Sequence, residues 1–223
     1  MTTLLFAIGV LSAVVLLPLL FRTFVDPTFR IWPTPAPGSW QSRLFWTLFR
    51  ALNVATLAVA AFDTVTALGL PDLLRGVALG GFAAGAVLYA YCLFALGKSN
   101  TYCNQDGLVT TGIYRWTRNP QYATIISVYA LLAVAADNPA TYLLGGALIA
   151  VYLMMALVEE SWLEAAYGGA YRRYRLRVPR FCNWRRADVL ATVTMRKARK
   201  WFAGRLAASA GDLQISTGPS RKR

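Results

Sequence analysis

The sequence predicts an all-α membrane protein, a bundle of about five transmembrane helices. Of its 223 residues, 57% are hydrophobic and only 15% are charged, whereas about a quarter of the residues in soluble domains are charged. The apolar residues gather in runs long enough to cross a bilayer, which takes roughly 20 residues. Basic residues gather in the loops and the tail, since 15 of the 23 Lys and Arg follow Glu160.

The apolar runs place the five spans in chain order. The first has no basic residue before it and is too long for a signal-peptide core, so we expect it to be retained. A loop rich in Pro and Trp, typical of a membrane interface, separates it from the second. Pro71 and Asp72 turn the chain into the third span, and a polar loop leads to the fourth. The expected spans are residues 2–21, 44–70, 73–97, 122–136 and 140–158.

Polar and small residues inside these spans carry separate expectations. Asp63 falls in the outer half of the second span, where an acidic side chain is a functional candidate, and Arg50 is expected to extend its charge to the interface. The third span carries the pairs Gly76-xxx-Gly80 and Gly81-xxx-Gly85. Small residues at this spacing let helices approach closely, and we expect them to pack inside the bundle rather than in a homodimer.

A short turn joins the last two spans. Asp137-Asn138-Pro139 leaves no room for anything but an antiparallel hairpin. Both open ends of this hairpin therefore lie at one side of the membrane. Arg118 to Tyr122 begin it and Glu159-Glu160 end it, so we expect these two groups to face each other.

Loop charge predicts the orientation. The loops at 22–43 and 98–120 and the C-terminal tail hold every loop Lys and Arg except Arg75, which places them in the cytoplasm and the N-terminus outside. The excess of Arg over Lys and the abundant Ala favour a bacterial inner membrane. Residues 187–223 are expected to form a basic amphipathic helix on anionic lipids, followed by a polar end. Nucleic acid is not the expected partner.

The sequence offers no metal or disulfide framework. It has three Cys without metal-ligand spacing and no His. The polar groups at the hairpin's open end are the better candidates for chemistry, because two adjacent Glu point about 100° apart on a helix and one should turn inward toward Arg118 or a ligand. Tyr114, Asn119 and Tyr122 add hydrogen-bonding groups at the same depth.

These residues resemble a known superfamily. The run Gly112 to Tyr122, followed by Glu159-Glu160-x-x-Leu163-x-x-x-Tyr167-Gly168-x-x-Tyr171-x-x-Tyr174-x-x-x-Val178, is similar to the integral-membrane methyltransferases. That superfamily includes isoprenylcysteine carboxyl methyltransferases and phospholipid N-methyltransferases. The resemblance implies a methyltransferase domain over residues 1–186, with its cofactor-binding part at about 108–181.

The resemblance also implies an S-adenosylmethionine pocket. The cofactor would be lined by Gly112, Tyr114, Arg118, Asn119, Pro120, Tyr122, Glu159 and Glu160, and the catalytic residues would be Arg118, Tyr122 and Glu160. Asn119 stands where many members have His, which removes an imidazole base. A lipophilic acceptor is expected because the pocket would lie at bilayer depth.

The acceptor and two other functions stay open at this stage. A carboxylate acceptor needs no base, whereas the Asn-Pro pair resembles enzymes that methylate lipid amines. A membrane reductase using NADPH is an alternative, in which the arginines from Arg172 to Arg180 would hold a 2′-phosphate. A non-enzymatic protein that binds lipid through its basic tail is another.

Overall fold

The computed structural model describes residues 1–26, 28–97, 100 and 107–181, and over this range the protein is all-α. Each of the five α-helices described follows one of the predicted apolar runs. The helices are α1 (Thr2–Val25), α2 (Trp40–Phe62), α3 (Asp72–Leu96), the short 3₁₀ helix η1 (Gly112–Arg115), α5 (Pro120–Ala136) and α6 (Pro139–Arg177). Four of them are long and apolar enough to cross a membrane, and α5 is a shorter apolar helix of 17 residues. The predicted membrane-helix bundle is confirmed.

The prediction that Asp63 lies inside a span is wrong. Helix α2 ends at Phe62, and Asp63 caps it with an extended backbone. The Asp63 carboxylate accepts a hydrogen bond from the amide of Val65 at 3.1 Å, so it organises the turn that follows. Asp63 therefore belongs to a helix end and is no candidate for chemistry within the bilayer.

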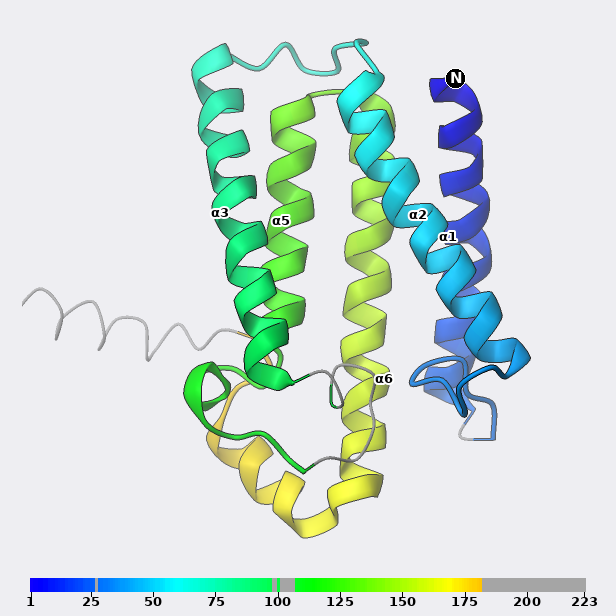
Figure 1. The fold of residues 1–223 in the computed structure, drawn as a ribbon, viewed down its shortest axis with the longest axis vertical. Helices are drawn as coiled ribbons and strands as arrows, with labels where there is room; N and C mark the ends of the chain where they lie inside the picture. The colour runs from blue at the N-terminus through cyan, green and yellow to red at the C-terminus, as the bar shows by residue number, and fades with distance from the viewer. Residues whose placement is uncertain (27, 98–99, 101–106, 182–223) are drawn as a thin grey trace, which may run out of the picture. The chain divides into compact units, whose positions relative to one another are not determined.

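The α5–α6 hairpin forms the centre of the bundle (Figure 1). Helix α3 packs on α5, whereas α1 and α2 pack on each other and on α6. Three large side chains with no measurable exposure, Leu16, Phe45 and Leu148, come from three different helices and lie in one core cluster. Helices α3 and α2 thus occupy different sides of the central hairpin.

The hairpin turn is held by side chains as well as by its length. Asp137 adopts a left-handed backbone with φ of 51°, and its carboxylate accepts the amides of Leu70 at 2.8 Å and Leu68 at 3.2 Å. Asn138 caps α6 by accepting the amide of Thr141 at 2.7 Å. These contacts tie the turn to the α2–α3 connection, so the predicted hairpin is confirmed.

The glycine pairs of α3 divide into two kinds. A Cβ added at Gly85 would lie 2.8 Å from Val128, and one at Gly81 would lie 3.2 Å from Leu131, so this pair allows α3 to approach α5 closely. Nothing lies within 4 Å of such a Cβ at Gly76 or Gly80. Close packing inside the bundle is confirmed for the second pair and wrong for the first.

Helix α6 extends far beyond the predicted end at Val158. It runs for 39 residues and turns at Gly168, which has φ of 52° and ψ of −123°, a conformation that glycine adopts without a steric penalty. The chain after Gly168 continues as a helix to Arg177. The predicted amphipathic tail, residues 187–223, lies outside the described residues.

Candidate active site

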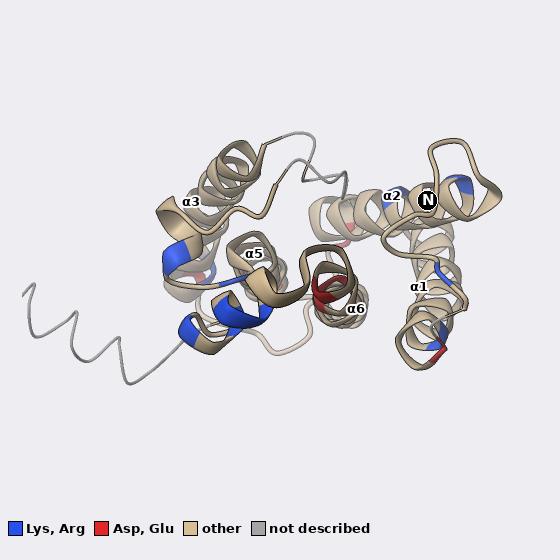
Figure 2. Ribbon diagram, turned by 90° about the horizontal axis from the view of Figure 1, so that it is seen from below, with Lys and Arg blue, Asp and Glu red and all other residues tan. Residues whose placement is uncertain are grey.

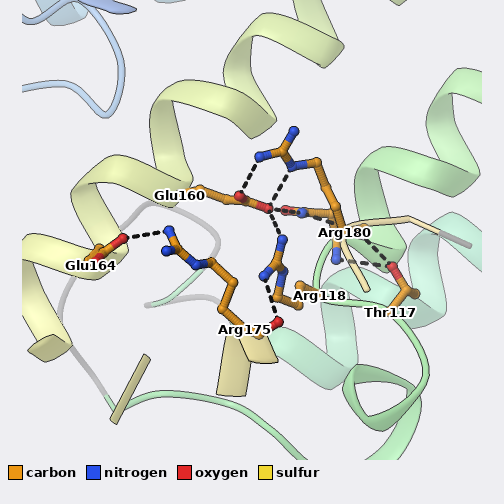
Figure 3. Close-up of polar contacts among 7 residues, drawn as sticks. Thr117, Arg118, Glu160, Glu164, Arg175 and Arg180 are labelled. Carbon is orange, nitrogen blue, oxygen red and sulfur yellow. Dashed lines mark hydrogen bonds and ion pairs between the residues drawn. The ribbon is translucent and has the colours of Figure 1, made fainter. Parts of the chain in front are cut away.

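Glu160 is the centre of a charged cluster (Figure 3). Figure 2 views the bundle from the end opposite the hairpin turn, with the basic and acidic residues coloured on the ribbon. The Glu160 carboxylate accepts hydrogen bonds from Arg118 Nη2 at 3.0 Å and from Asn119 Nδ2 at 3.1 Å. Arg180 binds both carboxylate oxygens, through Nε at 3.0 Å and Nη2 at 2.9 Å. The predicted meeting of Arg118 with the Glu pair is confirmed, and Glu160 is the partner.

Backbone contacts hold the two sides of this cluster together. The amide of Arg118 donates to the carbonyl of Pro179 at 2.9 Å, and the hydroxyl of Thr117 donates to the carbonyl of Arg180 at 2.9 Å. The segment after α6 therefore docks on the loop before α5. The hydrogen bonds that Arg180 donates to Glu160 raise the pKa of Arg180, so this guanidinium stays charged.

The cluster is arranged as a structural clamp. The side chains of Arg118 and Glu160 are both only 7% exposed, and removing one partner of such a pair leaves an uncompensated buried charge. Glu160 uses both oxygens on protein donors and lines neither of the two cavities described below. Its geometry fits a residue that positions Arg118.

Glu159 faces the other way. Its side chain accepts a hydrogen bond from the hydroxyl of Tyr122 on α5, and the residue is 8% exposed. The adjacent residue on α6 points about 100° away from Glu160, which explains why the two carboxylates meet different surroundings. Both carboxylates are buried, and Glu160 is the one that turns toward Arg118, as the sequence predicted.

A first cavity of about 490 Å³, part of it open to solvent, lies beside the charged cluster. Its polar wall includes Arg118, Asn119 and Glu159, and its aromatic wall includes Tyr167, Tyr171 and Tyr174 from the turn at the end of α6. Arg118, in the loop before α5, is the only Lys or Arg among the described residues that line this cavity.

Two buried polar atoms on this wall have no hydrogen-bond partner within the described part of the chain. They are the hydroxyl of Tyr171, a residue that is 1% exposed, and Nε of Arg118. A buried donor without a partner costs about 1–3 kcal/mol. A polar ligand in the first cavity would satisfy both atoms.

A second cavity of about 680 Å³ is mainly aromatic. Trp46 and Phe49 of α2, Tyr89 of α3 and Tyr152 of α6 line it, and Trp32 from the α1–α2 connection closes one wall. Among the described residues that line it, Glu159 is the only charged one. The space lies between α2 and α3 and against the central hairpin.

The two cavities share part of their walls. Leu96, Gln121 and Glu159 line both of them. The two cavities therefore meet at one carboxylate, and such an arrangement can bring two different molecules together.

Residues 74–170 match the family model described as phospholipid methyltransferase. This segment is a domain of the integral-membrane methyltransferase superfamily. The match runs from the first turn of α3 to just past the turn at Gly168, and it includes Arg118, Glu159 and Glu160. No curated protein and no solved structure matches the chain.

The methyltransferase domain has the donor set for S-adenosylmethionine in its first cavity. That cofactor carries an ammonium, a sulfonium, a carboxylate and ribose hydroxyls. Glu159 suits the cationic groups, while Arg118 Nε and the hydroxyl of Tyr171 are donors available to an anionic or neutral oxygen. The residues present therefore fit the group.

The structure separates the predicted site residues by position. Tyr114, Arg118, Asn119 and Glu159 line the first cavity, and Tyr122 and Glu159 line the second. Gly112 lines neither; it has φ of 58° and allows the turn into η1. Pro120 is the first residue of α5 and lines neither cavity.

Tyr114, one of the residues predicted to line the cofactor, makes two hydrogen bonds within the protein. Its hydroxyl donates to Gln121 Oε1 at 2.7 Å, and its carbonyl accepts the hydroxyl of Tyr174 at 2.6 Å. Burial raises the pKa of Tyr114 far above its ordinary value, which keeps the hydroxyl protonated. Tyr114 is therefore unsuited to accept a proton.

Three residues that the structure places at this site were not among the site residues predicted from the sequence. Tyr171 belongs to the quoted motif, and its spacing from Tyr167 was a usable signal. Arg180 reaches Glu160 only because the chain turns at Gly168, and Trp32 was interpreted as an interfacial residue but is 3% exposed. No local sequence pattern predicts the contact of Arg180 with Glu160 or the burial of Trp32.

The arginines proposed for a nicotinamide phosphate have other partners. Arg180 pairs with Glu160, while Arg175 and Arg172 pair with Glu164 at 2.7 and 3.8 Å. Three of the five arginines from Arg172 to Arg180 are thus engaged in ion pairs. The geometry does not favour the reductase alternative. Within the described ranges, no group of His, Cys, Asp and Glu could hold a metal ion.

Proposed function

We propose that the protein transfers a methyl group from S-adenosylmethionine to a lipid amine at the cytoplasmic face of its membrane. The observation that carries the proposal is the position of Glu159 at the wall shared by a polar and an aromatic cavity. The first cavity would hold the cofactor and the second the headgroup of the acceptor. Bound there, S-adenosylmethionine supplies an electrophilic methyl group.

Arg118, Asn119 and Tyr171 would bind the cofactor in the first cavity. Arg118 is fixed by Glu160 and by its contact with the carbonyl of Arg175 at 3.2 Å, so its orientation is set before any ligand arrives. Preorganised groups of this kind need no rearrangement during the reaction. The predicted catalytic role of Glu160 becomes, in this proposal, the positioning of Arg118.

The second cavity favours a cationic acceptor over a carboxylate. Its aromatic rings can stabilise an ammonium group through their faces, and Glu159 adds a negative charge. None of the described residues along its wall is Lys or Arg. An anionic acceptor would meet a carboxylate with no compensating cation, so a carboxylate lipid is disfavoured.

Glu159 and Tyr122 would handle the proton. An ammonium must lose its proton before its nitrogen can attack, and the Glu159 carboxylate is placed to accept it. Tyr122 donates its own hydrogen bond to Glu159 and fixes the orientation of that carboxylate. The surrounding Trp and Tyr rings limit the access of water.

The experiment is methyl transfer from tritium-labelled S-adenosylmethionine to membrane lipids, with purified protein in detergent. We expect label in an amine-bearing lipid that survives mild alkali, because an N-methyl group is stable to base. A methyl ester would release volatile methanol, which would move the acceptor to the carboxylate class. The proposal fails if no lipid is labelled and S-adenosylhomocysteine shows no saturable binding.

A further inference from the structure

Arg50 is the only charged residue of α2 after Arg43. It is the eleventh residue of the helix, roughly 15 Å from its start at a rise of about 1.5 Å per residue. Its side chain is exposed, and it forms no ion pair with a carboxylate in the described part of the chain. A charge at such a place is costly unless it meets water, a partner or a ligand.

The helix face on which Arg50 lies points toward the second cavity. Trp46 and Phe49, which line that cavity, are four residues and one residue before it. Asn53, three residues after it, accepts hydrogen bonds from the hydroxyls of Tyr129 at 2.5 Å and Tyr152 at 3.2 Å. These spacings place Arg50 at the exposed flank of the cavity-lining stripe.

The guanidinium is held in position by an aromatic ring. Its central carbon lies 5.5 Å from the centroid of the Trp46 ring, a cation–π contact. Trp46 in turn packs edge-on against Trp32 at 5.9 Å, and both rings line the cavity that contains Glu159. Stacking of this kind leaves the N–H groups at the edge of the guanidinium available to an anion.

We infer that Arg50 binds the phosphate of the acceptor's headgroup while the amine of the same headgroup lies in the aromatic cavity near Glu159. This inference rests on the proposed function and assigns to Arg50 the recognition of the acceptor's phosphate. A zwitterionic headgroup has one anionic and one cationic end. Arg50 outside the cavity and Glu159 inside it offer the complementary charges in the matching order.

Arg50 thereby determines specificity without touching the reacting atoms. A planar guanidinium can bind two phosphate oxygens at once, which orients the headgroup as well as attracting it. A snorkelling arginine would contact any phospholipid of the bilayer and would not distinguish acceptors. Recognition of the acceptor's phosphate and snorkelling to the bilayer surface differ in one measurable respect. Only in the first case does the affinity for a phosphate-bearing acceptor depend on Arg50 while the affinity for a phosphate-free acceptor does not.

The test compares two short-chain probes by titration into protein in a non-ionic detergent. One is dihexanoyl phosphatidylethanolamine, and the other is its analogue with the ethanolamine joined directly to the diacylglycerol. In Arg50→Gln we expect the Kd for the phosphate-bearing probe to rise roughly tenfold or more, since a hydrogen bond to a charged group is lost. The Kd for the phosphate-free probe should stay unchanged, and Arg50→Lys should fall between the wild type and Arg50→Gln.

Arg43→Gln is the matched control, because Arg43 is another exposed arginine of α2 and lies seven residues before Arg50. It should change neither Kd. The inference is overturned if Arg50→Gln weakens both probes equally, weakens neither, or is matched by Arg43→Gln. Arg50→Lys carries the same comparison if Arg50→Gln does not fold. S-adenosylhomocysteine is titrated in parallel: failure of the wild type to bind it removes the proposed function, while the lipid comparison still decides the role of Arg50.

Discussion

Glu159 and Glu160 are neighbours on one turn of α6, yet they meet opposite surroundings. Glu160 accepts four hydrogen bonds from Arg118, Asn119 and Arg180 and lines no cavity. Glu159 accepts from the hydroxyl of Tyr122 and borders two cavities. Two identical adjacent residues thus have different surroundings because they point in different directions: one carboxylate binds protein donors, and the other lies on the wall of two cavities.

The largest expected effect follows from removing the organising carboxylate. In Glu160→Ala, Arg118 stays buried without its counter-charge, so the free energy of unfolding should fall by about 3–5 kcal/mol. Denaturant titration in detergent measures this loss. Glu164→Ala is the control, because its partners are partly exposed and its loss should stay below about 1 kcal/mol. Equal stability of wild type and Glu160→Ala would contradict the clamp.

The next largest effect is expected on the rate of methyl transfer, with little change in the stability of the protein. Glu159→Gln keeps an acceptor for the Tyr122 hydroxyl but removes the charge and the proton acceptor. We expect the methyl-transfer rate to fall about a hundredfold, a typical loss for a general base, while the thermal midpoint changes little. A variant that unfolds, or one that retains the full rate, would show that Glu159 serves the protein in the same way as Glu160.

Two tyrosines sharpen the difference between ligand-facing and protein-facing groups. Tyr171→Phe removes a hydroxyl that has no partner in the described protein, so stability should hold and the affinity for S-adenosylhomocysteine should fall about tenfold. Tyr174→Phe removes a bond to the carbonyl of Tyr114 and should cost about 1 kcal/mol of stability with little change in affinity. Calorimetry and unfolding curves on both variants check this. If both variants changed stability and affinity in the same way, the distinction between a ligand-facing and a protein-facing hydroxyl would be contradicted.

The smallest effect on the site is expected at the far end of the hairpin. The amides of Leu70 and Leu68 help to hold the pKa of Asp137 below its ordinary value. A depressed carboxyl pKa stabilises the folded state above the ordinary pKa, and this stabilisation is lost as the pH falls through the folded value. Asp137→Ala should therefore lose stability at neutral pH and show a weaker acid dependence, with the affinity of the folded protein for S-adenosylhomocysteine unchanged. A large change in affinity would link the two ends of the hairpin.

The sequence was sufficient to predict the bundle, the hairpin and the pairing of Arg118 with the acidic doublet. Apolar run length and a tight turn are local properties, and they fix which ends of two helices lie together. The division between Glu159 and Glu160 was not predictable, because it depends on how α6 is rotated against α5. That rotation follows from side-chain packing over the whole hairpin.

The remaining surprises arose from long-range geometry. Arg180 reaches Glu160 because the chain turns at Gly168, which has a positive φ. A glycine within a helical pattern does not by itself predict such a turn, because the segment that the turned chain will contact is not known from the sequence. Trp32 is buried because the α1–α2 connection folds against α2, with its ring 4.9 Å from that of Phe45. The Pro and Trp content of the α1–α2 connection predicted a loop at the membrane interface, but it could not predict the contact between Trp32 and Phe45.

Photolabelling with an azido-adenine analogue of S-adenosylmethionine tests the assignment of the two cavities most directly. The account predicts that the label attaches to peptides lining the first cavity, above all the turn containing Tyr167, Tyr171 and Tyr174, and that S-adenosylhomocysteine prevents it. Labelling of the aromatic cavity around Trp32 and Trp46, or labelling that S-adenosylhomocysteine does not reduce, would contradict it.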